Sequence, residues 1–186
     1  DNGDSTFTKA ITITIENFGN VYLSNVKVSD DLTATFSAPT TFSVTGLTST
    51  DFTVDATFDG NANQNLLTAV DSLAVGASGT ITFDLTFDPN GVAGPFDNTA
   101  VASGDSPDGT TTTDNSQDGA DPDPDTNDDP TDNEDPTPIN IIEDPVIGIA
   151  KSAGAATDNG DGTFTTAITL TVENFGNVDL SNVQVS

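Results

Sequence analysis

In the segment AITITIE at residues 10–16, apolar and polar side chains alternate strictly from Ile11 to Glu16. In an extended chain its three Ile side chains fall on one face and the Thr and Glu side chains fall on the other. The segment NFGN at 17–20 then supplies residues typical of turns, and LSNVKV at 23–28 resumes the period of two. This pattern predicts a half-buried β-strand, a turn and a second strand.

The same pattern recurs along the chain and predicts the fold class. Further strands are expected at 33–36, 41–44, 52–58, 80–87, 98–102 and 145–151, separated by Gly, Asn and Asp clusters. Only residues 65–75 could carry a helical turn. Short strands with regular turns predict an all-β fold, an immunoglobulin-like antiparallel β-sandwich whose core is filled by Phe.

The first 29 residues return almost unchanged at the end of the chain. Residues 158–186 differ from residues 1–29 at only six positions, with a constant offset of 157. Two of the changes, Ile13 to Leu170 and Ile15 to Val172, preserve the apolar face. A repeat of this period is about the size of one domain, so the sequence predicts a tandem array of identical units.

Composition divides the chain into three parts. Residues 1–114 carry the sandwich pattern, and residues 145–186 contain the opening strands of the next identical repeat. Between them, residues 115–144 are rich in Asp and Pro, and nine of the eighteen residues in 118–135 are acidic. Pro disfavours both helix and central strand, so this segment is interpreted as an acidic connector.

The first unit is expected to lack its opening strand in this chain. The counterpart of strand 145–151 would lie before residue 1, which leaves one sheet edge unpaired. Either a preceding covalent repeat fills this edge, or a strand equivalent to 146–152 from a neighbouring molecule adds to it.

Charge and missing residue types exclude several functions. Three Lys, no Arg and thirty acidic residues give a formal net charge of −27, which disfavours nucleic acid and anionic lipid as partners. No apolar run approaches the ~20 residues that span a membrane, so membrane insertion is not expected. Cys and His are absent, which removes the usual nucleophile and general base. The chain is not expected to be an enzyme. General adaptation to a salty habitat is an alternative explanation of the acidity.

A family resemblance rests on a set of segments from most of one period. These are VIGIAK at 146–151, DGTFTTAITLTVENFGNVDLSNVQVS at 161–186, SDDL at 29–32, SLAVGASGTITFDLTF at 72–87 and DNTAVASG at 97–104. They resemble the bacterial surface repeat family known as domain of unknown function eleven. The resemblance implies immunoglobulin-like sandwiches that occur in tandem in large secreted or wall-associated bacterial proteins.

The acidic segment also predicts a calcium site. Oxygen-bearing side chains follow the spacing of a helix-loop-helix calcium loop, although Thr126 stands where that loop needs Gly. Flanking Pro residues exclude the helices, so a carboxylate-dense loop for hard cations is predicted instead. A solvated, repulsive linker is the alternative. The predicted metal ligands are Asp121, Asp123, Asp125, Asn127, Asp129, Asp132, Asp158 and Asp161.

The sequence thus predicts an extracellular structural module of a bacterial surface fibre, filament or giant adhesin, rigidified by calcium between units. Its expected partners are copies of itself and calcium ions. One alternative is a filament subunit joined by strand exchange. Another is a carbohydrate-binding or spacer module of a secreted enzyme, for which Tyr22 is the sole exposed aromatic candidate. An amide crosslink between a Lys and an Asn, such as Lys151 and Asn98, is a further possibility.

Overall fold

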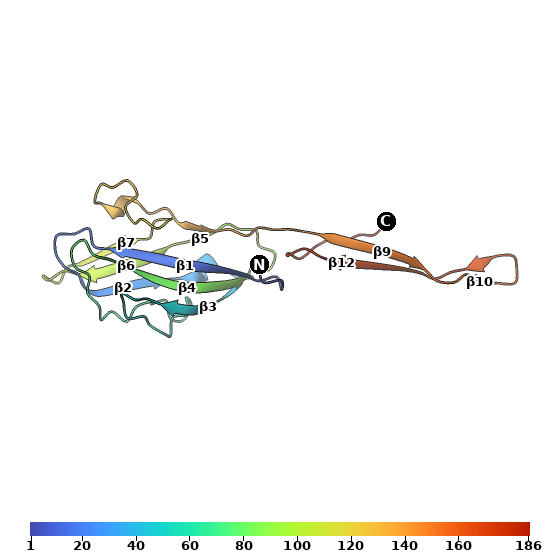
Figure 1. Ribbon diagram of the computed structural model, residues 1–186, viewed down its shortest axis with the longest axis horizontal. Coiled ribbons are helices and arrows are strands. Elements are labelled where there is room, and N and C mark those ends of the chain that lie inside the picture. The colour runs from blue at the N-terminus through green and yellow to red at the C-terminus, as the bar shows by residue number, and fades with distance from the viewer. The chain divides into compact units, whose positions relative to one another are not determined.

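The computed structural model describes residues 1–186 and is almost entirely β-structure (Figure 1). Its helical parts are α1 (Leu32–Thr35) and a single 3-10 turn, η1 (Pro130–Asp132). The strands are β1 (Phe7–Glu16), β2 (Ser24–Asp30), β3 (Thr41–Thr48), β4 (Ser78–Asp88), β5 (Phe96–Asn98), β6 (Ala100–Asp105), β7 (Thr111–Asn115), β8 (Thr137–Ile139), β9 (Ile147–Ala153), β10 (Thr157–Asp158), β11 (Phe164–Thr165) and β12 (Ile168–Asn174).

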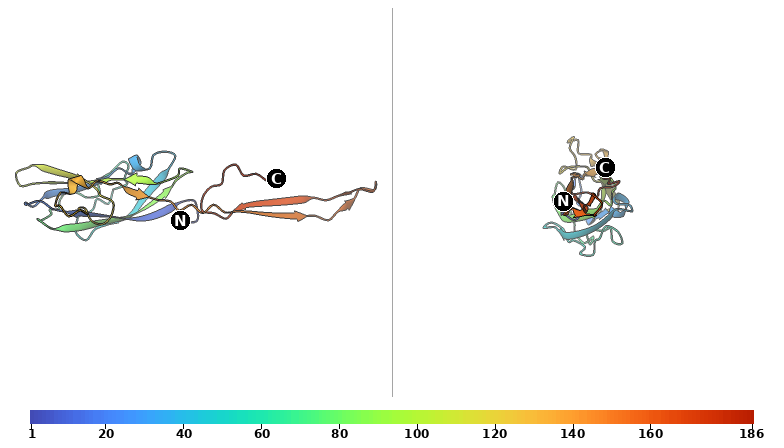
Figure 2. Two further views of the ribbon diagram at one scale, coloured as in Figure 1. Left: turned by 90° about the horizontal axis from the view of Figure 1, so that it is seen from above. Right: turned by 90° about the vertical axis from the view of Figure 1, so that its right-hand side faces the viewer.

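The chain forms two compact units, one essentially Thr6–Ile141 and the other Ile142–Ser186. In the first unit, one antiparallel sheet has the order β1-β4-β3 and a second has the order β2-β6-β7. The strands of β5 and β8 form a short additional pair. Figure 2 shows the two sheets of this unit as separate layers. The predicted all-β antiparallel class is therefore confirmed.

Phe side chains fill the space between the two sheets, as the sequence predicts. Phe87 of β4 is 1% exposed and packs against Phe7, Phe36 and Phe96, with ring centroids 5.0 to 5.9 Å apart. Phe83 meets Phe58 edge to face at 5.4 Å. Contacts of this kind add to the free energy gained by burying large apolar side chains.

Three local predictions are wrong, and side-chain oxygens explain two of them. Residues 33–36 belong largely to α1 because the Asp31 carboxylate accepts from the backbone N–H of Ala34 and caps a helical turn. Residues 52–58 form only a bridge at Val54, since nearby Asp side chains accept backbone N–H groups that a strand would pair. Residues 65–75 form no helix; they lie extended along β2 and contribute isolated bridges.

The second unit is a long hairpin, in which β9 pairs antiparallel with β12 and β10 pairs with β11. β12 overlaps the sequence copy of β1, and its turns have the same hydrogen bonds. Asn159 Nδ2 donates to Thr163 and Thr165 Oγ1 at 2.9 and 3.0 Å, as Asn2 donates to Thr6 and Thr8 at 2.7 and 3.0 Å. The sequence repeat is therefore also a structural repeat.

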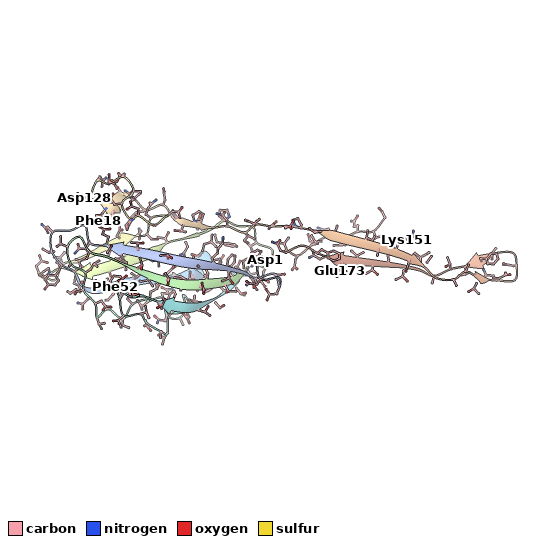
Figure 3. The ribbon with its side chains drawn as sticks, viewed as in Figure 1. Asp1, Phe18, Phe52, Asp128, Lys151 and Glu173 are labelled. Carbon is pink, nitrogen blue, oxygen red and sulfur yellow. The ribbon has the colours of Figure 1, made fainter.

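The hairpin side chains stand free of any covering layer. Every residue of β12 is exposed, and on β9 only Gly148 is partly covered. Figure 3 shows Lys151 and Glu173 projecting from its two strands.

Candidate functional site

The acidic segment leaves and rejoins the first unit. β7, which precedes the acidic residues, pairs with β6, and β8, which follows them, pairs with β5. Because β5 and β6 are neighbours in the sequence, within 96–105, both ends of the acidic segment are held at the same part of the first unit. The loop closes at its base, where the Asp118 N–H donates to the Asp135 carbonyl at 2.8 Å and the Asp135 N–H donates to Gln117 Oε1 at 2.9 Å. The first compact unit thus ends at Ile141, not at residue 114. Residues 115–141 are part of that unit and not a connector outside it.

Four of the predicted metal ligands gather inside this acidic loop. Asp123 is 3% exposed and accepts from the backbone N–H groups of Asn127 and Asp128 at 3.4 and 2.9 Å. The Asn127 side-chain amide donates to Asp125 Oδ2 and Asp132 Oδ2, both at 3.0 Å. The loop therefore organises Asp123, Asp125, Asn127 and Asp132 around local hydrogen bonds.

The acids of this loop affect the pKa of one another at Asp125. The pKa of Asp125 is raised, first by a hydrogen bond shared with Asp123 and further by the nearby negative charge of Asp132. No three acidic side chains of the chain nevertheless converge in an arrangement that would hold a metal ion. As placed, the side chains are a crowded carboxylate loop and do not form a coordination shell.

The remaining predicted ligands have other local roles. Asp121 accepts from the N–H of Asp123 at 3.1 Å, and Asp129 caps η1 by accepting from Thr131. Asp158 and Asp161 lie in the second unit, Asp158 at the end of β10 and Asp161 in the turn between β10 and β11. Asp158 accepts from the Gly160 N–H, and hydrogen bonds from Thr163 lower the pKa of Asp161. The hydrogen bonds of both carboxylates are thus those of turn residues.

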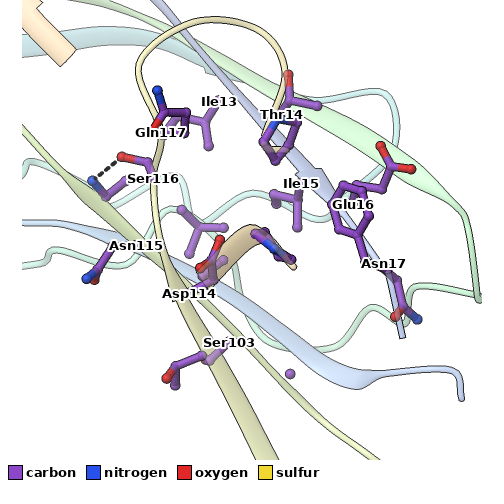
Figure 4. Close-up of a pocket in the computed structure, with 18 of the residues that line it drawn as sticks. Ile13, Thr14, Ile15, Glu16, Asn17, Ser103, Asp114, Asn115, Ser116 and Gln117 are labelled. Carbon is purple, nitrogen blue, oxygen red and sulfur yellow. Dashed lines mark hydrogen bonds between the residues drawn. The ribbon is translucent and has the colours of Figure 1, made fainter. Parts of the chain in front are cut away.

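A groove follows the open edge of β1. β1 has a hydrogen-bonded neighbour on one side only, β4, and its other edge is unpaired. Beside it lies a cavity of about 600 Å³, bounded on the opposite side by β7 and the beginning of the acidic loop. Figure 4 shows Ile13 and Ile15 of β1 and Asp114 of β7 around this groove. We call it the β1 groove.

Asp114 is the unusual polar group of the β1 groove. Its Oδ1 atom is buried and has no hydrogen-bond partner. Burial raises the pKa of Asp114, and the charges of Glu134 and Asp129 raise it further. Sequence reasoning missed Asp114, since TTTDNS at 111–116 has too few apolar residues to predict strand β7.

A second buried carboxylate lies in the core of the first unit. Asp30 is 1% exposed and accepts from Asn98 Nδ2 at 2.9 Å, while its Oδ1 has no partner. Burial raises the pKa of Asp30 to about 6, against the lowering effect of Asn98. Asn98, considered above for an amide crosslink, thus has a carboxylate beside it. Thr35 Oγ1 donates a hydrogen bond to Asn98 Oδ1 at 2.7 Å.

The comparisons with known proteins give no relative. No family model, curated protein or solved structure matches the chain. No helix in the structure has the length and apolar character required to cross a membrane. Tyr22, the exposed aromatic residue considered for glycan binding, is 52% exposed.

Proposed function

We propose that the chain is a tandem-repeat structural module of a bacterial extracellular or cell-surface fibre or adhesin, built from immunoglobulin-like sandwiches joined end to end. The observation that carries this proposal is the repeated hydrogen-bond pattern of residues 1–29 and 158–186. Asn17 Nδ2 donates to the Val21 carbonyl at 2.9 Å, and Asn174 donates to Val178 at 2.8 Å. A second copy of the same module therefore begins directly after the first.

The distribution of polar groups supports a mechanical role more than a chemical one. Neither the buried Asp30 nor the partly buried Asp114 has a His, Cys or Arg beside it, because the chain contains none. Modules that repeat without changing their core lengthen a protein at little cost in new sequence. Reach, spacing or display at a surface is the function that this architecture serves.

Force spectroscopy of a multi-repeat chain tests the proposal. Each module should unfold as a separate event with the same gain in contour length, roughly 55 nm for 157 residues at ~3.6 Å each. Irregular increments, or a single event for the whole array, would contradict a structure of independent modules.

Calcium is the cation that we propose for the acidic loop. The raised pKa of Asp125 supports it, because a divalent ion among Asp123, Asp125 and Asp132 would relieve the repulsion that favours protonation. The side chains would have to rotate toward a shared centre to bind it. Since the loop closes on its own unit, the ion would stiffen this loop and thereby the end of the unit to which it belongs.

Thermal unfolding with calcium and with a chelator tests the ion. An ion that binds only the folded state raises stability by about 2.7 kcal/mol at one hundred times its Kd. Asp125→Asn combined with Asp132→Asn should abolish the shift, whereas Asp84→Asn on β4 should preserve it. An unchanged melting temperature in the parent chain would remove calcium from the proposal and leave the repeat architecture untouched.

A further inference from the structure

The sequence copy of β1 shows what the open edge of β1 would accept. Residues 164–174 repeat residues 7–17 at the offset of 157, and their strand β12 pairs with β9. β1 has the same alternation of side chains and is followed by the same turn. Its only paired neighbour is β4, and no strand pairs with its other edge. The partner seen beside β12 is therefore the natural candidate for the edge of β1.

The register of the hairpin can be transferred to β1 by subtracting the repeat offset. Ala153, Lys151 and Ile149 lie opposite Ile168, Leu170 and Val172. The residues of β1 that correspond to Ile168, Leu170 and Val172 are Ile11, Ile13 and Ile15, and all three are among the residues that line the β1 groove.

The side-chain pattern of the added strand also fits the β1 groove. Residues directly opposite in an antiparallel pair share a face of the sheet. Ile147, Ile149, Lys151 and Ala153 would therefore face inward, and the small residues Gly148, Ala150 and Ser152 would face outward. Two Ile side chains entering the groove would cover the apolar face of β1 that is now partly exposed.

The single cation of this strand has a matching anion in the β1 groove. Lys151 would stand opposite Ile13, and Ile13 and Asp114 line the same groove from its two sides (Figure 4). Asp114 has a buried Oδ1 atom that accepts no hydrogen bond. A buried carboxylate without a partner is costly, and an ammonium group delivered there would supply both a hydrogen bond and opposite charge.

We propose that the β1 groove is the binding site for residues 146–153 of a second copy of the repeat, which add antiparallel to β1 and place Lys151 against Asp114. In this arrangement the added strand is paired with β1 as β9 is paired with β12. The inference rests on the proposed tandem architecture and adds to it a specific joint: the last strand before one module completes the first sheet of that module. The sheet then has four strands, with β1 inside it.

A synthetic peptide tests the β1 groove directly. The probe is the sequence DPVIGIAKSAG of residues 144–154, added to the 186-residue chain and followed by calorimetry and by amide resonances. Saturable binding should shift the amides of β1 and protect from exchange those that do not donate to β4. A nitroxide at the first residue of the peptide should broaden signals near Asn17, and one at its last residue should broaden signals near Ile11. Binding away from β1, or with the opposite polarity, would overturn the proposal.

Paired substitutions test the charge contact. Lys151→Met in the peptide should weaken binding to the parent chain by roughly tenfold, as loss of a partly buried ion pair does. Asp114→Asn in the chain should weaken binding of the parent peptide by a similar factor, and the two changes together should cost no more than either alone. Asp84→Asn, which removes an exposed carboxylate from β4, should leave the affinity unchanged. Equal losses from Asp84→Asn and Asp114→Asn would reduce the contact to general charge and contradict it.

Two outcomes separate this inference from the proposed function. Should the peptide fail to bind while a multi-repeat chain still unfolds in equal steps, the β1 groove assignment is wrong and the modular role stands. Should the peptide bind while the steps are irregular, the strand site stands and the modular role falls. The peptide arm does not depend on a protein variant, so a misfolded Asp114→Asn chain would not obscure the result.

Discussion

β1 and β12 have nearly the same sequence but very different surroundings. Phe7 at the start of β1 is 6% exposed, whereas its copy Phe164 is 66% exposed. Ile15 is 8% exposed and its counterpart Val172 is 39% exposed. The turns that flank the two strands have the same hydrogen bonds, within a few tenths of an ångström. Local sequence thus determines strand and turn, while burial requires the rest of the sandwich.

The largest expected difference between the copies comes from their Phe residues. Phe7→Ala should lower the free energy of unfolding of the first unit by about 3–5 kcal/mol, because a buried aromatic side chain leaves a cavity against Phe87. Phe164→Ala should change the same free energy of unfolding by less than about 0.5 kcal/mol. Denaturant unfolding of both variants measures the difference. Similar losses would mean that Phe164 has a core of its own.

The pH dependence of stability should also differ between the units. Because burial raises the pKa of Asp30 from 3.8 to about 6, protonation of Asp30 favours the folded first unit. This contribution is complete below about pH 4 and is lost as the pH rises through 6; it amounts to about 2–3 kcal/mol. Asp161 in the hairpin has a lowered pKa, so its contribution is present above the ordinary carboxyl range and is lost on acidification.

Unfolding curves of the first unit at pH 4 and pH 7 check the Asp30 prediction. Asp30→Asn should remove most of the difference between the two pH values, since Asn does not titrate. Asp84→Asn serves as the matched control, because it removes one negative charge from a less buried position on β4. An equal effect of both substitutions would assign the pH dependence to net charge instead of Asp30.

The Asn residues after the two strands give a smaller contrast. Asn17 is 3% exposed, and its side-chain amide donates both to Val21 and to the buried carbonyl of Leu73 at 3.0 Å. Asn174 keeps the bond to Val178. Asn17→Ala should therefore cost about 2 kcal/mol, since it leaves a buried carbonyl unsatisfied. Asn174→Ala should cost under about 1 kcal/mol. Equal losses would show that the Leu73 contact contributes nothing.

The sequence predicts the parts of the fold that local periodicity controls. The alternation in 10–16 and 80–87 correctly predicts β1 and β4. It fails at 52–58, where side-chain oxygens of Asp residues take backbone N–H groups. It also fails at β7, whose Thr and Asp residues have no alternation of their own and are placed by pairing with β6.

The candidate sites could be predicted only in part, for a related reason. Acidic density and spacing single out the segment that contains Asp123, Asp125, Asn127 and Asp132, but they cannot show that β7 and β8 on either side of it pair with β6 and β5. Asp30, which is followed by Asp31, and Asp114 lie in sequence surroundings that do not indicate burial. Their surroundings come from other parts of the chain, since Asp30 accepts a hydrogen bond from Asn98 and Asp114 lies opposite Ala102 in the pairing of β6 and β7.

Completing the second unit is the most direct test of the account. A chain extended after Ser186 by residues 30–157 of its own sequence would contain two full repeats. We predict that β12 then pairs with a copy of β4, that its amide protons become as slow to exchange as those of β1, and that Phe164 becomes buried. Exchange of β12 that remains fast in the extended chain would contradict the claim that the two copies begin the same module.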